Sequence, residues 1–165
     1  MDIDAYLDSV TNCLQSRGYE IKHGVLYEGQ DFKCVAKHGS FRPELFMTYF
    51  DFFFMFSHFE TITFTGLEDY SEICMRYGSR NKLVPGFPIP FTYHVVFSAA
   101  IVDDVDDKTV EELRLKSRPW HFASAEFPAI YCLRSEQLYH SETVPPWMQY
   151  DSYFRALACQ YLLPD

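Results

Sequence analysis

The stretch Leu45–Phe56, with the sequence LFMTYFDFFFMF, is the densest apolar segment of the chain. Read as a strand, it carries apolar side chains on both faces, a pattern typical of a central strand that is covered on both sides. Read as a helix, it would be apolar nearly all round and rich in aromatic residues, which are indifferent helix formers. We therefore predict a central strand, bent near Asp51, the only carboxylate in the block.

Segments of helical and strand periodicity surround this block. Asp2–Arg17 has apolar residues at helical spacing and a glycine just beyond its end, which predicts an amphipathic helix. Residues 19–37 predict strand pieces joined by turns, and Thr65–Glu68 has the pattern of a capping box that begins a second helix, with Thr65 as its N-cap. Further along, the patterns predict a buried strand over 93–102, a helix over 108–116, strands over 127–133 and 137–140, and a last helix over 150–162.

This order of elements predicts the fold class. We expect one α+β (or α/β) domain over residues 1–165, with three to four helices packed on a central mixed sheet and an N-terminal helix followed by a strand meander. A chain of 165 residues fits one domain, and its 48% hydrophobic content predicts a sizeable core. The stretch 81–92 carries several prolines and a glycine, so it is the candidate for an internal hinge.

The order helix–strand–strand–strand–helix–strand, up to residue 102, resembles the core order of the restriction-endonuclease-like superfamily. The resemblance implies a metal-dependent nuclease with an Asp before one strand and a Glu-x-Lys or Asp-x-Lys triplet on the next. Asp31 occupies the first position, but Glu44 is followed two positions later by Phe46, and Asp51 by Phe53. Without a second carboxylate and a lysine, the metal would lack ligands and a group to position water. This departure argues against nuclease activity.

Charge and cysteine usage limit the partners and the compartment. The formal net charge is −9, which repels phosphate backbones, so direct nucleic-acid binding is disfavoured and a basic partner is favoured. The five cysteines are odd in number and scattered singly, which argues against a zinc ribbon and a disulfide framework. The N-terminus lacks the order of a signal peptide, and no apolar run has the length of a membrane span. We expect a cytoplasmic protein without membrane contact.

The acidic run Asp103–Asp107 is the sharpest polar feature of the sequence. It lies after a predicted buried strand and before a predicted helix, where α/β sheets place ligand-binding loops. Hard cations prefer carboxylate ligands, but the run lacks the alternation, central glycine and distal glutamate of a calcium loop. Capping of the following helix is the simpler interpretation. Asp103 and Asp104 remain candidate contacts for a ligand or partner, and we predict no metal site.

The two tryptophans give further candidate contacts. Trp120, followed by His121, and Trp147 each lie beside prolines, near the end of a predicted strand or helix. A tryptophan on a proline-stiffened loop is a good rigid anchor for a partner, and the alternative is that both close the ends of the core.

Histidines form no metal-binding spacing motif. His94, His121 and His140 lie in or beside predicted strands, where they could converge as metal ligands or as a base for Cys132, but isolated structural histidines are the simpler interpretation.

Signatures of catalysis and cofactor binding are absent, including G-x-S-x-G, G-x-G-x-x-G and the phosphate-binding P-loop. We therefore predict a non-enzymatic acidic domain, without cofactor, that binds, regulates or inhibits another protein. The alternative is a nuclease-like metal-dependent enzyme, which would be inactive because the usual Glu-x-Lys motif is missing from this sequence. Asp51 discriminates between the two, because a carboxylate in so apolar a strand must lie at a bend or be compensated. Burial beside another carboxylate or a histidine favours the enzyme, and exposure at a kink favours the binding protein.

Overall fold

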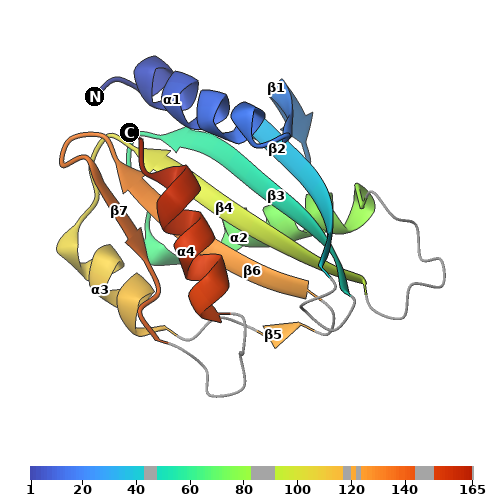
Figure 1. Cartoon of the computed structure of the whole chain (residues 1–165). Helices are drawn as coiled ribbons and strands as arrows, with labels where there is room; N and C mark the ends of the chain where they lie inside the picture. The colour runs from blue at the N-terminus through green and yellow to red at the C-terminus, as the bar shows by residue number, and fades with distance from the viewer. Residues whose placement is uncertain (43–47, 83–91, 117–119, 122–123, 144–150, 165) are drawn as a thin grey trace.

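A computed structural model describes residues 1–42, 48–82, 92–116, 120–121, 124–143 and 151–164 (Figure 1). Its helices are α1 (Ile3–Ser16), α2 (Phe64–Arg80), α3 (Asp107–Leu115) and α4 (Asp151–Leu162). Its strands are β1 (Glu20–Tyr27), β2 (Gln30–Arg42), β3 (Thr48–Phe59), β4 (Thr92–Val102), β5 (Trp120–His121), β6 (Ser124–Cys132) and β7 (Gln137–His140). The predicted α+β fold, with a helix followed by a strand meander, is confirmed.

The described strands form one mixed, seven-stranded sheet in the order β1-β2-β3-β4-β6-β5, with β7 also paired to β6. Strands β1, β2 and β3 are the antiparallel meander, and β3, β4 and β6 run parallel to one another. Helices α1 and α4 pack on one face of the sheet, and α2 and α3 pack on the other (Figure 1). No helix in the described part of the chain is long and apolar enough to cross a membrane.

Strand β3 is the centre of this sheet. Every residue from Phe50 to Ser57 is buried, because β2 and β4 cover both edges of β3 and helices cover both faces. The predicted central strand is confirmed. The predicted bend near Asp51 does not interrupt it, since Asp51 pairs with Gly39 on one side and with His94 on the other in an unbroken register.

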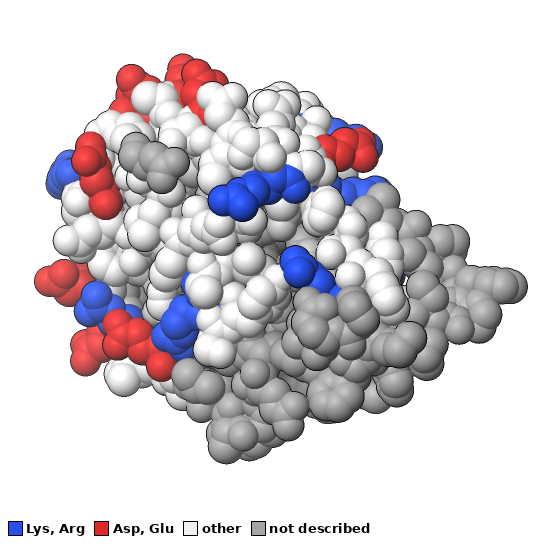
Figure 2. Space-filling view, in the orientation of Figure 1, with Lys and Arg blue, Asp and Glu red and all other residues white. Residues whose placement is uncertain are grey.

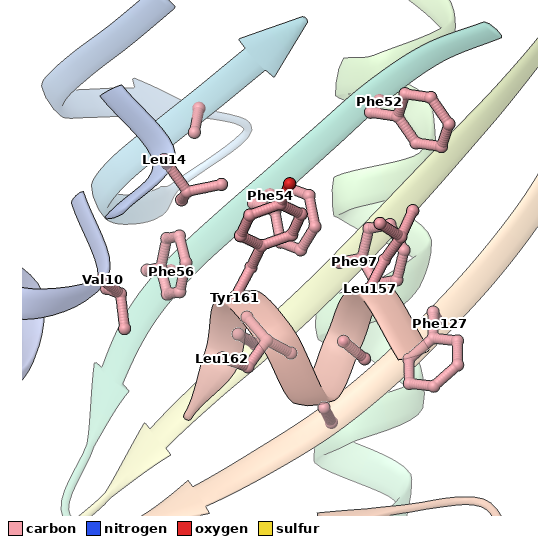
Figure 3. Packing of buried hydrophobic residues seen from close by; sticks show 14 of the residues in the cluster. Val10, Leu14, Phe52, Phe54, Phe56, Phe97, Phe127, Leu157, Tyr161 and Leu162 are labelled. Atoms are coloured by element: carbon pink, nitrogen blue, oxygen red, sulfur yellow. The ribbon is translucent and has the colours of Figure 1, made fainter. Parts of the chain in front are cut away.

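Aromatic side chains fill the layer between the sheet and helices α1 and α4. Figure 3 shows phenylalanines from β3, β4 and β6 pointing into this layer, toward side chains of both helices. Phe54 stacks on Phe97 with ring centroids 4.2 Å apart. Tyr6 of α1 stacks on Tyr131 of β6 at 4.0 Å, and its hydroxyl donates a hydrogen bond to the Leu162 carbonyl at 2.8 Å. The apolar interior thus joins both ends of the chain.

Side-chain caps define where three helices begin. Asp2 caps α1 by accepting from the Ala5 amide at 2.8 Å, and Asp106 caps α3 by accepting from the Thr109 amide at 2.9 Å. The predicted N-cap Thr65 is wrong: Thr63 caps α2, because the helix begins at Phe64, two residues earlier than the capping-box pattern suggests. The candidate hinge 81–92 lies mostly outside the described residues.

Candidate functional site

Polar side chains gather at the end of the sheet where the parallel strands begin. Asp51 of β3 pairs with His94 of β4, which pairs with Ser124 of β6, so the three form one row across the sheet. All three are buried, with 3% of Asp51 and 5% of His94 exposed. Residues paired in this way point to the same face of a sheet. Here it is the face covered by α2, where Phe53 and Val96, two residues further along β3 and β4, also pack.

The last turn of α2 contacts this row. The Ser79 hydroxyl lies 3.1 Å from Nε2 of His94. This contact needs glycine at position 78, because a Cβ there would lie 2.8 Å from Cγ2 of Val96. Gly78 therefore lets α2 approach β4 closely enough for an exposed serine to meet a buried imidazole.

A second carboxylate is buried close to the row. Glu126 of β6 pairs with Val96, two residues beyond Ser124 and therefore on the same face. Burial, followed by the charge of Glu126, raises the pKa of the Cys74 thiol on α2. We call Asp51, His94, Ser124 and Glu126 the buried row. Asp51 is thus buried beside a histidine, the outcome that favours an enzyme.

Asp31 and Asp51, two carboxylates considered in the nuclease resemblance, do not meet, and Glu44 lies outside the described residues. Strands β2 and β3 are antiparallel, so Asp31, at the start of β2, lies near the end of β3, where its carbonyl accepts from the Ser57 hydroxyl at 2.9 Å. Asp51 lies near the start of β3, opposite Gly39. In the described part of the chain, no group of three or more His, Cys, Asp or Glu side chains could hold a metal ion.

A groove opens at the other end of the parallel strands, where β3, β4 and β6 finish. Its volume is about 510 Å³. Residues 1–3, at the start of α1, form one side, and residues at or beyond the strand ends form the rest. We call it the terminal groove; its lining residues are Met1, Asp2, Ile3, His58, Asp103, Leu133 and Arg134.

Backbone hydrogen bonds hold the walls of the terminal groove in place. The Asp103 amide donates to the Phe59 carbonyl at 3.3 Å, and the Leu133 amide donates to the Val102 carbonyl at 2.8 Å. These bonds continue the pairing of the parallel strands past their ends. As a result, Nε2 of His58 lies 2.9 Å from Oδ1 of Asp103, and 53% of the Asp103 side chain is exposed.

Two basic groups around the terminal groove form ion pairs with neighbouring carboxylates. Arg134 pairs with Asp104, and the amino group of Met1 lies 2.7 Å from Oε1 of Glu136. Carboxylates outnumber basic groups here: the acids are Asp2, Asp103, Asp104 and Glu136, and the basic groups paired with them are Arg134 and the Met1 amino group.

The residues of the acidic run 103–107 have two different roles. Asp106 is the N-cap of α3 and accepts from both the amide and the hydroxyl of Thr109, which lowers the pKa of the Asp106 carboxyl. The capping interpretation is therefore confirmed for this residue. Asp103 and Asp104 instead face the terminal groove and its rim, through their contacts with His58 and Arg134.

The structure separates the predicted site residues into these two ends. Asp51 belongs to the buried row, whereas Asp103 lines the terminal groove and Asp104 pairs with Arg134 at its rim. In β5, the backbone of Trp120 pairs with Ala125 and that of His121 with Ser124, which places His121 at the edge of the buried row. Trp147 lies outside the described residues.

His94 and His140 do not converge. His94 belongs to the buried row, while His140 of β7 has its Nε2 3.9 Å from Sγ of Cys159 on α4. Cys132 instead directs its Sγ to the Asp103 carbonyl at 3.8 Å. Sequence reasoning missed His58, Ser79 and Cys159, whose neighbours come from distant segments that no spacing pattern connects.

No family model, curated protein or solved structure matches the chain.

Proposed function

We propose that this chain is a non-enzymatic acidic domain that binds a basic partner protein at the terminal groove, as a regulator or inhibitor of that partner. One observation carries the proposal: an open groove of about 510 Å³ has carboxylates on two of its walls, Asp2 at the N-cap of α1 and Asp103 from the loop after β4. The ends of parallel strands are where open α/β sheets place binding sites.

Charge supports a basic partner. The net charge of −9 attracts cations over the whole surface, and the acids around the terminal groove exceed its cations. On the face shown in Figure 2, most of the visible acidic groups lie along α1 and around α3, the side on which β3, β4 and β6 end in Figure 1. Such a field speeds the encounter with a cationic partner and repels an anionic one.

The shape of the terminal groove supports recognition of a protruding side chain. A groove of about 510 Å³ is too small to hold a folded domain, but it accepts one or two long side chains. Arginine is the best fit, because its planar guanidinium makes paired hydrogen bonds to a carboxylate. The backbone bonds at the strand ends already hold Asp103 in place, so little conformational entropy is lost on binding.

A metal-dependent nuclease has less support. The burial of Asp51 beside His94 favours chemistry at the buried row, but Asp31 lies near the other end of the same strand pair. The free state of all five cysteines fits a reducing compartment, so a cytoplasmic location is part of the proposal.

An NMR titration of the ¹⁵N-labelled chain with an arginine-rich peptide tests the proposal. We expect shifts at the amides of His58, Asp103 and Arg134, and weaker binding at high salt because salt screens exposed charges. Asp103→Asn should weaken the peptide's affinity about twofold to fivefold, since a surface ion pair contributes up to about 1 kcal/mol.

Glu20→Gln is the matched control for that titration. Glu20 is exposed at the start of β1, an edge strand two strands away from β3, and it is level with Phe53 in the middle of β3. Glu20→Gln therefore removes one negative charge from a part of the sheet that does not line the terminal groove. If Asp103→Asn and Glu20→Gln weaken binding equally, the peptide senses only net charge. Absence of binding, or shifts away from the groove, would equally contradict the proposal.

A further inference from the structure

A cysteine and a histidine meet on the surface between α4 and β7, away from both polar ends described above. Cys159 is exposed on α4, and its Sγ lies 3.9 Å from Nε2 of His140. Nδ1 of His140 lies 3.0 Å from the Ser141 carbonyl oxygen. A carbonyl only accepts, so in the neutral ring Nδ1 carries the hydrogen and Nε2 presents its lone pair toward the thiol.

Packing holds this imidazole in its orientation. The ring of Phe127 packs against His140 with centroids 5.7 Å apart. Ser141, which supplies the carbonyl, is buried, and its hydroxyl donates to the Lys116 carbonyl at 2.7 Å. The arrangement therefore has a nucleophile, a base within reach of it and a third group that orients the base, which together make an activated nucleophile.

We propose that Cys159 and His140 form a nucleophile–base pair that reacts with hydroperoxides. Nε2 of His140 takes the thiol proton while sulfur attacks one peroxide oxygen. The S–O bond forms as the O–O bond breaks, and the leaving hydroxide or alkoxide takes the proton from Nε2 as water or alcohol. Sulfur is oxidised by two electrons to a sulfenic acid and the peroxide is reduced, so the step balances without another reactant.

Other cysteines of the chain provide internal comparisons. Cys34, Cys74 and Cys132 are buried, and burial raises the pKa of Cys34 to about 12. Cys13, on α1, is partly exposed. A thiol that is merely accessible reacts in proportion to its exposure, whereas Cys159 should react faster than exposure explains.

Site-resolved alkylation of the full, native chain with iodoacetamide tests this inference. At neutral pH we expect Cys159 to react about tenfold faster than N-acetylcysteine, a free thiol without a neighbouring base. His140→Asn keeps a donor near the position of Nδ1 and removes Nε2, so it should slow Cys159 about tenfold and leave Cys13 unchanged. After hydrogen peroxide treatment, dimedone should label Cys159 in the unaltered chain.

Three results would overturn the inference. The first is a Cys159 that alkylates no faster than N-acetylcysteine in the unaltered chain, a comparison that needs no folded variant. The second is alkylation at the original rate in His140→Asn and His140→Gln, each with an unchanged circular dichroism spectrum. Fast alkylation without a dimedone adduct would overturn the assignment of hydroperoxide as the reactant.

Discussion

Strands β3 and β4 bring an aspartate and a histidine together twice, once at each end of their parallel pairing. Where the strands begin, Asp51 of β3 lies beside His94 of β4, and both are buried. Where they finish, His58 of β3 lies 2.9 Å from Asp103 beyond β4, with 27% and 53% of their side chains exposed. The residue types are the same, so burial makes the difference between the two ends.

That difference gives the two ends different capabilities. A buried carboxylate persists only where its surroundings compensate its charge, so the buried row is tied to the stability of the fold. An exposed pair is weakened by water and salt and exchanges partners at little cost. The terminal groove is therefore the end at which a partner can bind without unfolding the core.

The largest predicted effect comes from replacing an aspartate by alanine at each end of the β3–β4 pairing and comparing the two variants. Asp51→Ala should lower the free energy of unfolding by about 3 kcal/mol. Removing the carboxylate leaves the buried polar group beside it, His94, without a compensating charge. Asp103→Ala should change it by less than about 1 kcal/mol, because the His58–Asp103 pair is largely exposed. Urea unfolding of both variants measures the contrast. Equal losses would show that burial does not separate the two ends.

A second comparison uses two glycines of one helix. Gly78 lies at the end of α2 over the buried row, and a Cβ there would lie 2.8 Å from Val96. Gly66 lies at the start of α2, and a Cβ there would meet Ile62 and Thr63 at 3.4 Å. We expect Gly78→Ala to lower the free energy of unfolding by about 1–3 kcal/mol through overpacking.

Gly66→Ala is the control, and it should stabilise the protein by a few tenths of a kcal/mol through helix propensity. Thermal unfolding of the two variants tests both expectations. A Gly78→Ala variant as stable as Gly66→Ala would show that α2 shifts freely over β4, and the contact between Ser79 and His94 would then lose its structural basis.

Local patterns in the sequence were enough to predict the central strand. The aromatic block is apolar on both faces, and β3 is covered on both faces and both edges. Strict alternation along residues 32–37 would place Phe32 with Cys34 and Ala36 on one face, yet Phe32 packs in the other layer. Gly24, next to the partner of Phe32 on β1, has a φ of 61°, a backbone change that hydrophobic alternation does not reveal.

The candidate sites depend on the register between distant strands. Asp51 and Asp103 were both predicted as candidate contacts, but their histidine partners were not, because each pairing depends on how β3 aligns with β4. The same holds for Cys159 and His140, which lie on α4 and β7. Sequence patterns identify residues that can carry chemistry, whereas register and burial decide which of them meet.

Asp106 gives the smallest predicted effect and divides the acidic run at the groove end. Hydrogen bonds from Thr109 lower the pKa of its carboxyl below the ordinary value of 3.8, so the charged form stabilises the folded state. That contribution is complete above the ordinary value and is lost as pH falls through the lower, folded value.

Asp106→Asn keeps a capping oxygen without a titrating group, so its stability deficit against the unaltered chain should shrink in acid. Asp106→Ala removes the cap as well, and its difference from Asp106→Asn should not depend on pH in urea unfolding. A constant deficit of Asp106→Asn would mean that Asp106 acts through geometry alone, like any neutral cap, and not through its charge.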